Sequence, residues 1–271
     1  MSGVQIAAIQ MNSHDNVSAN IGTAANLLDR AAGDGAVLAV LPENFAGMGR
    51  DEAYRVSIAE QDGNGPIQDC LSAAAARNRM WIIGGTLPLR GDDPQRPFAA
   101  CLVFDHQGRR VARYDKIHLF DVAIPGGDES YRESAFTTPG HEPLVLNTPW
   151  GGLGVAVCYD LRFPEMLRSH PGVQMDILAI PAAFTFTTGQ AHWELLLRAR
   201  AIENLCYVVA AAQTGVHPGG RRTWGHSMIV DPWGKKLAVL DDVVDSISSA
   251  IDPDYLISVR EKFPALSHRR L

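Results

Sequence analysis

Three polar side chains stand directly after apolar stretches at widely separated points of the chain. Glu43 follows AVLAVLP, Lys116 follows VARYD, and Cys158 follows LGVAV. Each stretch is typical of a buried strand that ends at a turn, and sheets with parallel strands bind their ligands just beyond the carboxyl ends of the strands. We therefore expect the three side chains at positions where they can act on a ligand.

A glutamate, a lysine and a cysteine together have the parts for nucleophilic attack on a carbonyl group. A neutral thiol attacks poorly, whereas a carboxylate base and a nearby cation favour the thiolate. The Lys116 ammonium and the backbone N–H after Cys158 are then suited to stabilise the oxyanion of a tetrahedral intermediate. Glu43 would return the proton to the leaving amine and later activate water.

Each of these residues also has a purely structural interpretation. A free cysteine such as Cys158 is commonly a small buried hydrophobe. A buried lysine can simply pair with a carboxylate, and a glutamate after a proline can serve as a cap or a surface acid. Only the combination of the three residue types indicates catalysis.

The elements that must position these residues alternate between strands and helices. Strands are expected within 4–10, 36–44, 80–86, 99–105, 111–119, 153–158, 175–181, 206–213, 224–232, 235–240 and 245–251, and helices over 17–34, 67–78, 164–170, 190–204 and 252–263. Many strands interleaved with helices predict a layered α/β fold, and the absence of a linker or repeat predicts a single domain over residues 1–271. Residues 120–141 are rich in glycine, proline and charge, which predicts a long functional loop.

The composition excludes several classes of protein. Of the 271 residues 46% are hydrophobic and 20% are charged, and the net charge of -6 provides no basic surface for nucleic acid. No segment approaches the roughly 20 apolar residues of a membrane span, so we expect a cytoplasmic protein without a membrane partner. The cysteines at positions 70, 101, 158 and 206 form no CxxC pair, and no HExxH spacing is present. Neither a metal nor a cofactor is predicted.

Three short segments resemble the signature motifs of the nitrilase superfamily of carbon–nitrogen hydrolases. They are LPEN at 41–44, YDKIHLFD at 114–121 and CYDLRFPE at 158–165, in the order and spacing of that family. The resemblance implies a four-layer αββα sandwich, a homodimer or higher homo-oligomer, and a catalytic triad of Glu43, Lys116 and Cys158. Glu133 in YRESAFTTPG matches a further acid that lies near the lysine, although a surface position in a loop is the alternative.

Later stretches resemble one branch of that superfamily, the amidases that include the omega-amidases and the deaminated glutathione amidases. The segments 181–204, 206–215, 225–234 and 263–270 are more similar to the second group. The resemblance implies hydrolysis of deaminated glutathione to 2-oxoglutarate and cysteinylglycine, which is metabolite repair. The alternatives are an omega-amidase acting on 2-oxoglutaramate, a nitrilase acting on a nitrile, and a non-catalytic binding protein with the same fold.

A substrate of this kind needs a pocket with cations for its carboxylates. The residues expected to line the pocket or to bind the substrate are Tyr159, Phe184, Thr185, Thr188, Arg221 and Arg222. Arg162 is a further candidate, but we expect it to brace the turn after Cys158, against Glu165. For Arg221 and Arg222 the alternative is a solvated loop.

Overall fold

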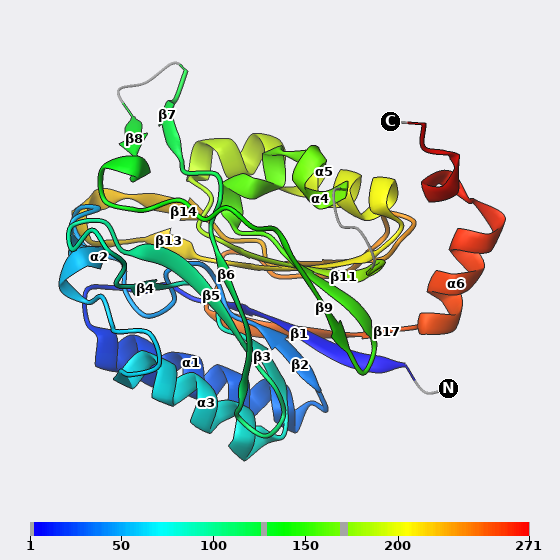
Figure 1. Cartoon of the computed structure of the whole chain (residues 1–271), viewed down its shortest axis with the longest axis horizontal. Coiled ribbons are helices and arrows are strands. Elements are labelled where there is room, and N and C mark those ends of the chain that lie inside the picture. The colour runs from blue at the N-terminus through cyan, green and yellow to red at the C-terminus, as the bar shows by residue number, and fades with distance from the viewer. Residues whose placement is uncertain (1–2, 126–128, 169–172, 271) are drawn as a thin grey trace.

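Two β-sheets pack face to face and carry helices on their outer faces, which is the expected αββα sandwich (Figure 1). The computed structural model describes residues 3–125, 129–168 and 173–270. The first sheet has the order β17-β1-β2-β3-β5-β4, with β6 paired to β5. Its strands are β1 (Val4–Gln10), β2 (Leu38–Val40), β3 (Trp81–Ile83), β4 (Leu87–Leu89), β5 (Phe98–Phe104), β6 (Arg110–Asp115) and β17 (Asp245–Ile251).

The second sheet has the order β16-β15-β12-β11-β10-β9. Its strands are β9 (Leu144–Thr148), β10 (Gly151–Val155), β11 (Met175–Ala182), β12 (Tyr207–Ala212), β15 (Met228–Val230) and β16 (Lys236–Val239). The central strands β10, β11 and β12 are parallel, and the strands that flank them run antiparallel. Parallel strands are covered on both faces, which explains why β11 and β12 read as continuous apolar runs.

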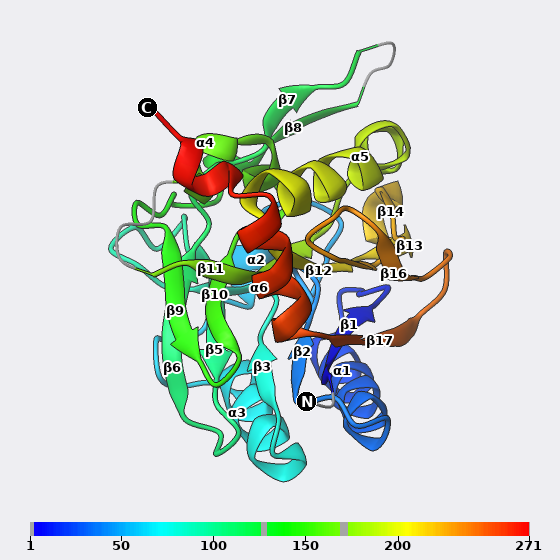
Figure 2. The ribbon, with the colours of Figure 1, turned by 90° about the vertical axis from the view of Figure 1, so that its right-hand side faces the viewer.

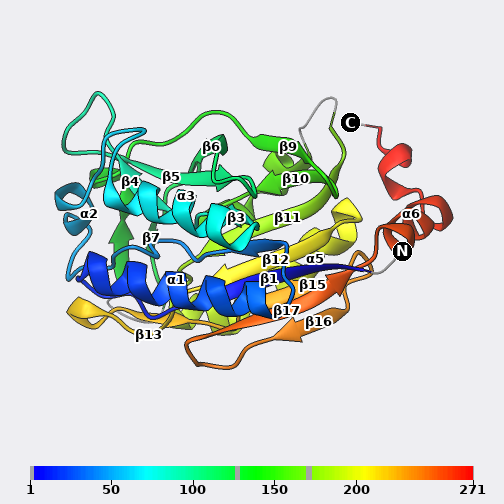
Figure 3. The same cartoon turned by 90° about the horizontal axis from the view of Figure 1, so that it is seen from below.

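Helices α1 (Val17–Gly33) and α3 (Pro66–Asn78) lie side by side on the outer face of the first sheet (Figure 3). Helices α4 (Pro164–Arg168) and α5 (Phe186–Asn204) cover the second sheet (Figure 1). The expected helix over 164–170 is described only to Arg168, because residues 169 and 170 lie outside the described part of the chain. Helix α6 (Pro253–Lys262) follows β17 and runs across the end of the sandwich (Figure 2).

Two hydrophobic cores hold these layers together. The larger core lies between the sheets and under α5, and it joins Val40 of the first sheet to Val155 of the second and to Trp193 of α5. The smaller core packs the first sheet against α1 and α3, and it includes Ile9 of β1 and Leu28 of α1. Burying such side chains contributes about 1.5 to 3 kcal/mol each, so the two sheets are fixed relative to one another.

Helix α5 begins four residues earlier than the expected position 190. Thr185 is its N-cap, and the Thr185 hydroxyl oxygen accepts a hydrogen bond from the Thr188 N–H at 3.4 Å. The cap satisfies a backbone donor that the first turn leaves without a helical partner. Because the chain turns directly after β11, helix α5 begins next to the pocket described below.

The segment 120–141 is more regular than the sequence indicates. It contains a hairpin of β7 (Asp121–Ala123) and β8 (Ser130–Arg132), followed by the single turn Glu133–Ala135, while residues 126–128 lie outside the described part. Both strands have three residues, too few to produce a recognisable alternation of polar and apolar side chains. The hairpin rises above the second sheet (Figure 1).

Short elements complete the fold. A further hairpin joins β13 (Thr214–Val216) to β14 (Arg222–Trp224), and helix α2 (Tyr54–Ser57) has a single turn. No helix among the described residues is long and apolar enough to cross a membrane.

Candidate active site

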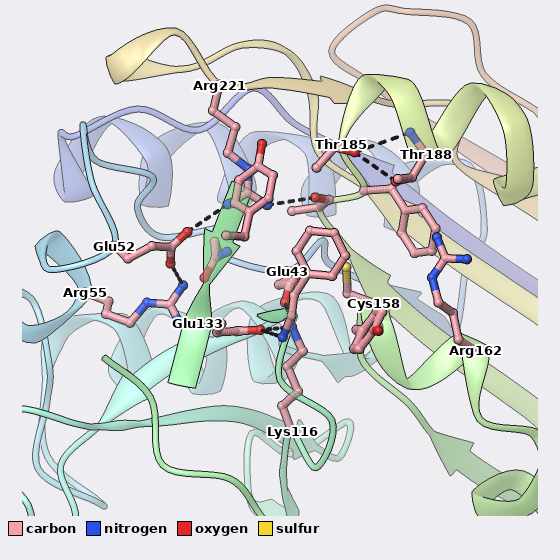
Figure 4. A pocket seen from close by; sticks show the side chains of 16 residues that line it. Glu43, Glu52, Arg55, Lys116, Glu133, Cys158, Arg162, Thr185, Thr188 and Arg221 are labelled. Carbon is pink, nitrogen blue, oxygen red and sulfur yellow. Dashed lines mark hydrogen bonds and ion pairs between the residues drawn. The ribbon is translucent and has the colours of Figure 1, made fainter. Parts of the chain in front are cut away.

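Glu43, Lys116 and Cys158 come from three different strand ends and meet in one pocket (Figure 4). Glu43 follows β2 and Lys116 follows β6, so both belong to the first sheet, whereas Cys158 follows β10 of the second. The Lys116 Nζ donates to Glu43 Oε1 at 2.7 Å. All three side chains are buried. Two sheets therefore contribute to one cluster of reactive groups.

Glu133 is the second acid bound to Lys116, as expected from its sequence segment. Its Oε2 accepts hydrogen bonds from Lys116 Nζ at 2.8 Å and from the Phe120 N–H at 2.8 Å, and its Oε1 lies 3.2 Å from Arg55 Nη1. Burial alone would raise the pKa of Glu133, but the charges of Lys116 and Arg55 lower it to about 2. Glu133 is therefore a permanent anion at neutral pH.

The same contacts keep Lys116 protonated. Burial lowers the pKa of an ammonium group, but the carboxylates of Glu133 and Glu43 outweigh burial and raise the pKa of Lys116 above its ordinary value. A buried lysine that cannot lose its proton is a fixed positive charge. Lys116 is thus suited to electrostatic stabilisation and not to proton transfer.

Cys158 begins the short 3-10 turn Cys158–Arg162 and has a positive φ of 50°. Asp160 anchors this turn because its carboxylate accepts from the Val157 N–H at 2.9 Å and from the Tyr114 hydroxyl at 2.6 Å. It also accepts from the His118 N–H at 2.9 Å. Tyr114 and His118 stand two residues before and after Lys116. One buried carboxylate therefore fixes the cysteine relative to the lysine.

The Cys158 thiol is neutral in the resting protein. Burial raises its pKa well above the ordinary value, the Glu43 carboxylate raises it further, and Lys116 and the Ala183 backbone only partly oppose them. The Lys116 cation alone therefore does not produce a thiolate in the resting protein. Glu43 lies close enough to the thiol to raise its pKa and is the carboxylate available to accept its proton.

The pocket around these groups is lined by side chains that follow strands of both sheets. Its walls include most of the residues predicted from the sequence, namely Glu43, Lys116, Glu133, Cys158, Tyr159, Phe184, Thr185, Thr188 and Arg221. Arg162 also lines the pocket, with its guanidinium over the rings of Tyr159 and Phe184 and its Nη2 3.2 Å from His192 Nδ1. Arg162 therefore does more than brace the turn that follows Cys158.

Arg222 lies outside the walls of this pocket. Its guanidinium stacks on the Phe186 ring, 3.6 Å from the ring centroid, and it lines a groove next to the pocket. Arg221 instead turns inward, where its Nη1 donates to Glu52 at 3.1 Å and its Nη2 donates to the Ala183 carbonyl at 3.1 Å. Of the two neighbouring arginines, Arg221 lines both the pocket and the groove, whereas Arg222 lines the groove and not the pocket.

Sequence reasoning missed Arg55 and Glu52, which extend the cluster. Arg55 bonds to Glu133, to Thr137 and to Glu52, and Glu52 also accepts from Arg221. The result is a chain of alternating charges that runs Lys116, Glu133, Arg55, Glu52, Arg221. No sequence signal marks Arg55, because α2 is too short to show a periodic pattern. Within the described ranges, no three His, Cys, Asp or Glu side chains are grouped to hold a metal ion.

Comparison with known proteins places this site in a family. A model of the carbon–nitrogen hydrolase family matches residues 5–261. A deaminated glutathione amidase of Yersinia enterocolitica is 41% identical over the whole chain and 94% of its own length, and the human one is 40% identical over 98% of this chain and 82% of its own.

Solved structures agree with this assignment. The Caenorhabditis elegans NitFhit protein has a TM-score of 0.91 at 39% identity, over 100% of this chain and 66% of that longer chain. Saccharomyces cerevisiae Nit3, a member of branch 10 of the nitrilase superfamily, has a TM-score of 0.87 at 28% identity, over 100% of this chain and 97% of its own. The chain belongs to the carbon–nitrogen hydrolase family of the nitrilase superfamily.

Proposed function

We propose that this chain is a cysteine-dependent amidase that hydrolyses deaminated glutathione to 2-oxoglutarate and cysteinylglycine. One observation carries the catalytic part: Cys158 shares a buried pocket with Glu43 and Lys116, and the Lys116 Nζ lies 2.7 Å from Glu43 Oε1. The substrate is supported by the relatives named deaminated glutathione amidase, about 40% identical over nearly the whole chain.

The first half of the reaction forms a thioester. Glu43 takes the proton of Cys158 while the sulfur attacks the amide carbon, because a resting thiolate is disfavoured. The carbonyl oxygen becomes an oxyanion, and the Lys116 ammonium and the Tyr159 backbone N–H stabilise it. Glu43 then gives the proton to the amide nitrogen, the C–N bond breaks, and the amine leaves.

The second half hydrolyses the thioester. Glu43 takes a proton from water, the resulting hydroxide attacks the thioester carbon, and Lys116 again stabilises the oxyanion. The C–S bond breaks, the carboxylic acid is released, and the proton returns to the Cys158 sulfur. Glu133 takes no proton in either half, since its pKa of about 2 keeps it ionised. Its role is to hold Lys116 charged and in place.

The acyl part of the substrate occupies the side of the pocket formed by Phe184, Thr185 and Thr188. Its carboxylate needs a cation, and Arg162 lines the same side without belonging to the chain of alternating charges around Glu133. A charge-assisted hydrogen bond from a guanidinium is about twice as strong as a neutral one. Arg162 therefore binds the acyl carboxylate in this proposal.

The test compares purified protein on deaminated glutathione, 2-oxoglutaramate and a panel of nitriles. We expect the highest kcat/KM on deaminated glutathione, with cysteinylglycine as the released product. A higher kcat/KM on 2-oxoglutaramate, with ammonia as product, would make the chain an omega-amidase instead. Turnover of nitriles alone would make it a nitrilase, and no turnover at all would leave a binding protein.

The expected setting is a cytoplasmic homodimer or a higher homo-oligomer. Four cysteines without a disulfide among them suit a reducing compartment. Cell fractionation and light scattering of the purified protein test the two parts of this expectation separately.

A further inference from the structure

A second groove adjoins the catalytic pocket beside Arg221. Tyr131 and Arg221 line both spaces, so the two are adjacent. The groove runs between the β7–β8 hairpin, the first turn of α5 and the turn that leads into β14. We call it the outer groove and define it by Tyr131, Phe186, Arg221 and Arg222. A substrate that is too long for the pocket can continue into it.

Arg222 gives the outer groove an available cation. Its side chain is exposed, and its guanidinium lies 3.6 Å from the centroid of the Phe186 ring. Within the described part of the chain, the guanidinium makes no ion pair or hydrogen bond. Stacking uses the flat face of a guanidinium and leaves the N–H groups at its edge free for a carboxylate. Phe186 therefore holds Arg222 in a geometry suited to binding an anion.

Two further features add positive potential to the outer groove. Arg221 is tied to Glu52, but its Nε is buried and has no hydrogen-bond partner in the structure. The groove also meets the first turn of α5, which contains no acidic residue. The N-terminus of a helix carries a partial positive charge, here on a helix of 19 residues. An anion entering the groove is attracted from three directions.

The space on the other side of Arg221 also carries positive charge. Besides Arg221 it is lined by Arg50, Arg55 and Arg132, together with the carboxylates of Asp51 and Glu52. The only acid of the outer groove within the described residues is Glu129, which accepts a hydrogen bond from the Tyr131 hydroxyl. What distinguishes the outer groove is the exposed Arg222 guanidinium stacked on the Phe186 ring, and a variant of Arg50 tests the neighbouring space.

We infer that the outer groove binds the leaving group of the amide, and that Arg222 is a specificity-determining residue that binds the terminal carboxylate of that group. The inference rests on the proposed function, because cysteinylglycine is a leaving group of two residues that ends in a carboxylate. Extended, two residues span about 7 Å. The leaving group of 2-oxoglutaramate is ammonia, which is too small to extend from the pocket into the outer groove.

The experiment measures kcat/KM of the wild type and of Arg222→Gln on three substrates: deaminated glutathione, its C-terminal glycine amide, and 2-oxoglutaramate. For the wild type we expect the neutral amide to be about tenfold worse than the acid, the value of a charge-assisted hydrogen bond at an exposed site. In Arg222→Gln this ratio should fall to about one, because only the acid loses a contact. Turnover of 2-oxoglutaramate should not change.

A matched control separates this groove from its neighbour. Arg50→Gln removes an exposed arginine from the other space and should leave all three substrates unaffected. The inference is overturned if the wild type accepts the acid and the neutral amide equally, if Arg222→Gln lowers turnover of all three substrates alike, or if Arg50→Gln reproduces its effect. If the wild type hydrolyses 2-oxoglutaramate but not deaminated glutathione, the proposed function fails and the inference fails with it.

Discussion

Glu133 and Lys116 form a buried ion pair whose Oε2 to Nζ distance is 2.8 Å, and the same ammonium lies 2.7 Å from Glu43. One cation is therefore shared by two carboxylates, and Arg55 supplies the positive charge that balances the second one. Because charges buried without partners are costly, this balance allows the cluster to exist inside the fold. Glu43 and Glu133 contact the same lysine, but only Glu133 is also paired with Arg55, so the two acids are expected to have different roles.

Replacing Glu133 by Gln should abolish most of the activity without unfolding the protein. The amide keeps the shape of the side chain but removes the anion that holds Lys116 charged and oriented. We expect kcat to fall by about 10² to 10³, the range for loss of an oxyanion-stabilising group, with little change in KM. Steady-state kinetics and circular dichroism measure the two effects. Glu142→Gln, an exposed acid, is the control, and a wild-type kcat in Glu133→Gln would contradict the role.

Replacing Glu43 by Gln should separate thiol reactivity from catalysis. Burial and the Glu43 charge both raise the pKa of Cys158, so removing that charge lowers the pKa. Alkylation of Cys158 by iodoacetamide should therefore begin at lower pH in Glu43→Gln than in the wild type, although amide turnover is lost. Mass spectrometry at a series of pH values measures the rates, with Cys158→Ala as the blank. A profile shifted to higher pH would refute the assignment.

The low pKa of Glu133 predicts a loss of stability in acid. The carboxyl group has a pKa of about 2 in the folded protein against an ordinary 4.5, so its contribution is complete above pH 4.5. The contribution disappears as the pH falls from 4.5 toward 2, because the unfolded chain binds the proton first. The pKa shift of Glu133 corresponds to a contribution to the free energy of unfolding on the order of 3 kcal/mol. Urea titrations between pH 3 and 6 should show a shallower pH dependence for Glu133→Gln than for the wild type, and equal slopes would exclude this explanation.

Asp160→Asn should weaken both the fold and the reaction. The carboxylate is fully buried and accepts from the Val157 N–H, the Tyr114 hydroxyl and the His118 N–H. An amide places an NH₂ group where one oxygen accepts, so at least one buried donor loses its partner at a cost of about 1 to 3 kcal/mol. Thermal unfolding should show the loss, and kcat should fall because the Cys158 turn is no longer fixed to the Lys116 segment. Asp34→Asn, at the surface, should change neither, and a full-activity Asp160→Asn would disprove the positioning role.

The strand-end residues of the pocket are predictable because their position follows from local sequence. Glu43 and Cys158 each come within three residues of the end of an apolar strand, and Lys116 follows its strand directly. A strand of this kind has a recognisable composition, and the residue after it is placed at the edge of a sheet. The layered architecture follows from the same runs, which are apolar on both faces because both faces are buried.

The remaining parts depend on contacts between distant segments. Arg55 reaches Glu133 over 78 positions of sequence, and nothing in its own single-turn helix indicates that partner. The neutral state of Cys158 depends on how completely the fold buries it beside Glu43, which no local pattern encodes. The β7–β8 hairpin likewise escapes prediction because its strands have three residues each.

The division of the site between two sheets has a consequence for how the protein acquires its activity. The chain forms most of the first sheet before residue 116, builds the second from residue 144 onward, and then returns so that β17 pairs with β1. A partly folded chain in which the two sheets have not docked does not bring the Glu43 carboxylate, the Lys116 ammonium and the Cys158 sulfur together. Contacts between such distant segments form slowly. The three groups therefore meet only after the two sheets have docked, and partly folded forms of the protein lack the assembled site.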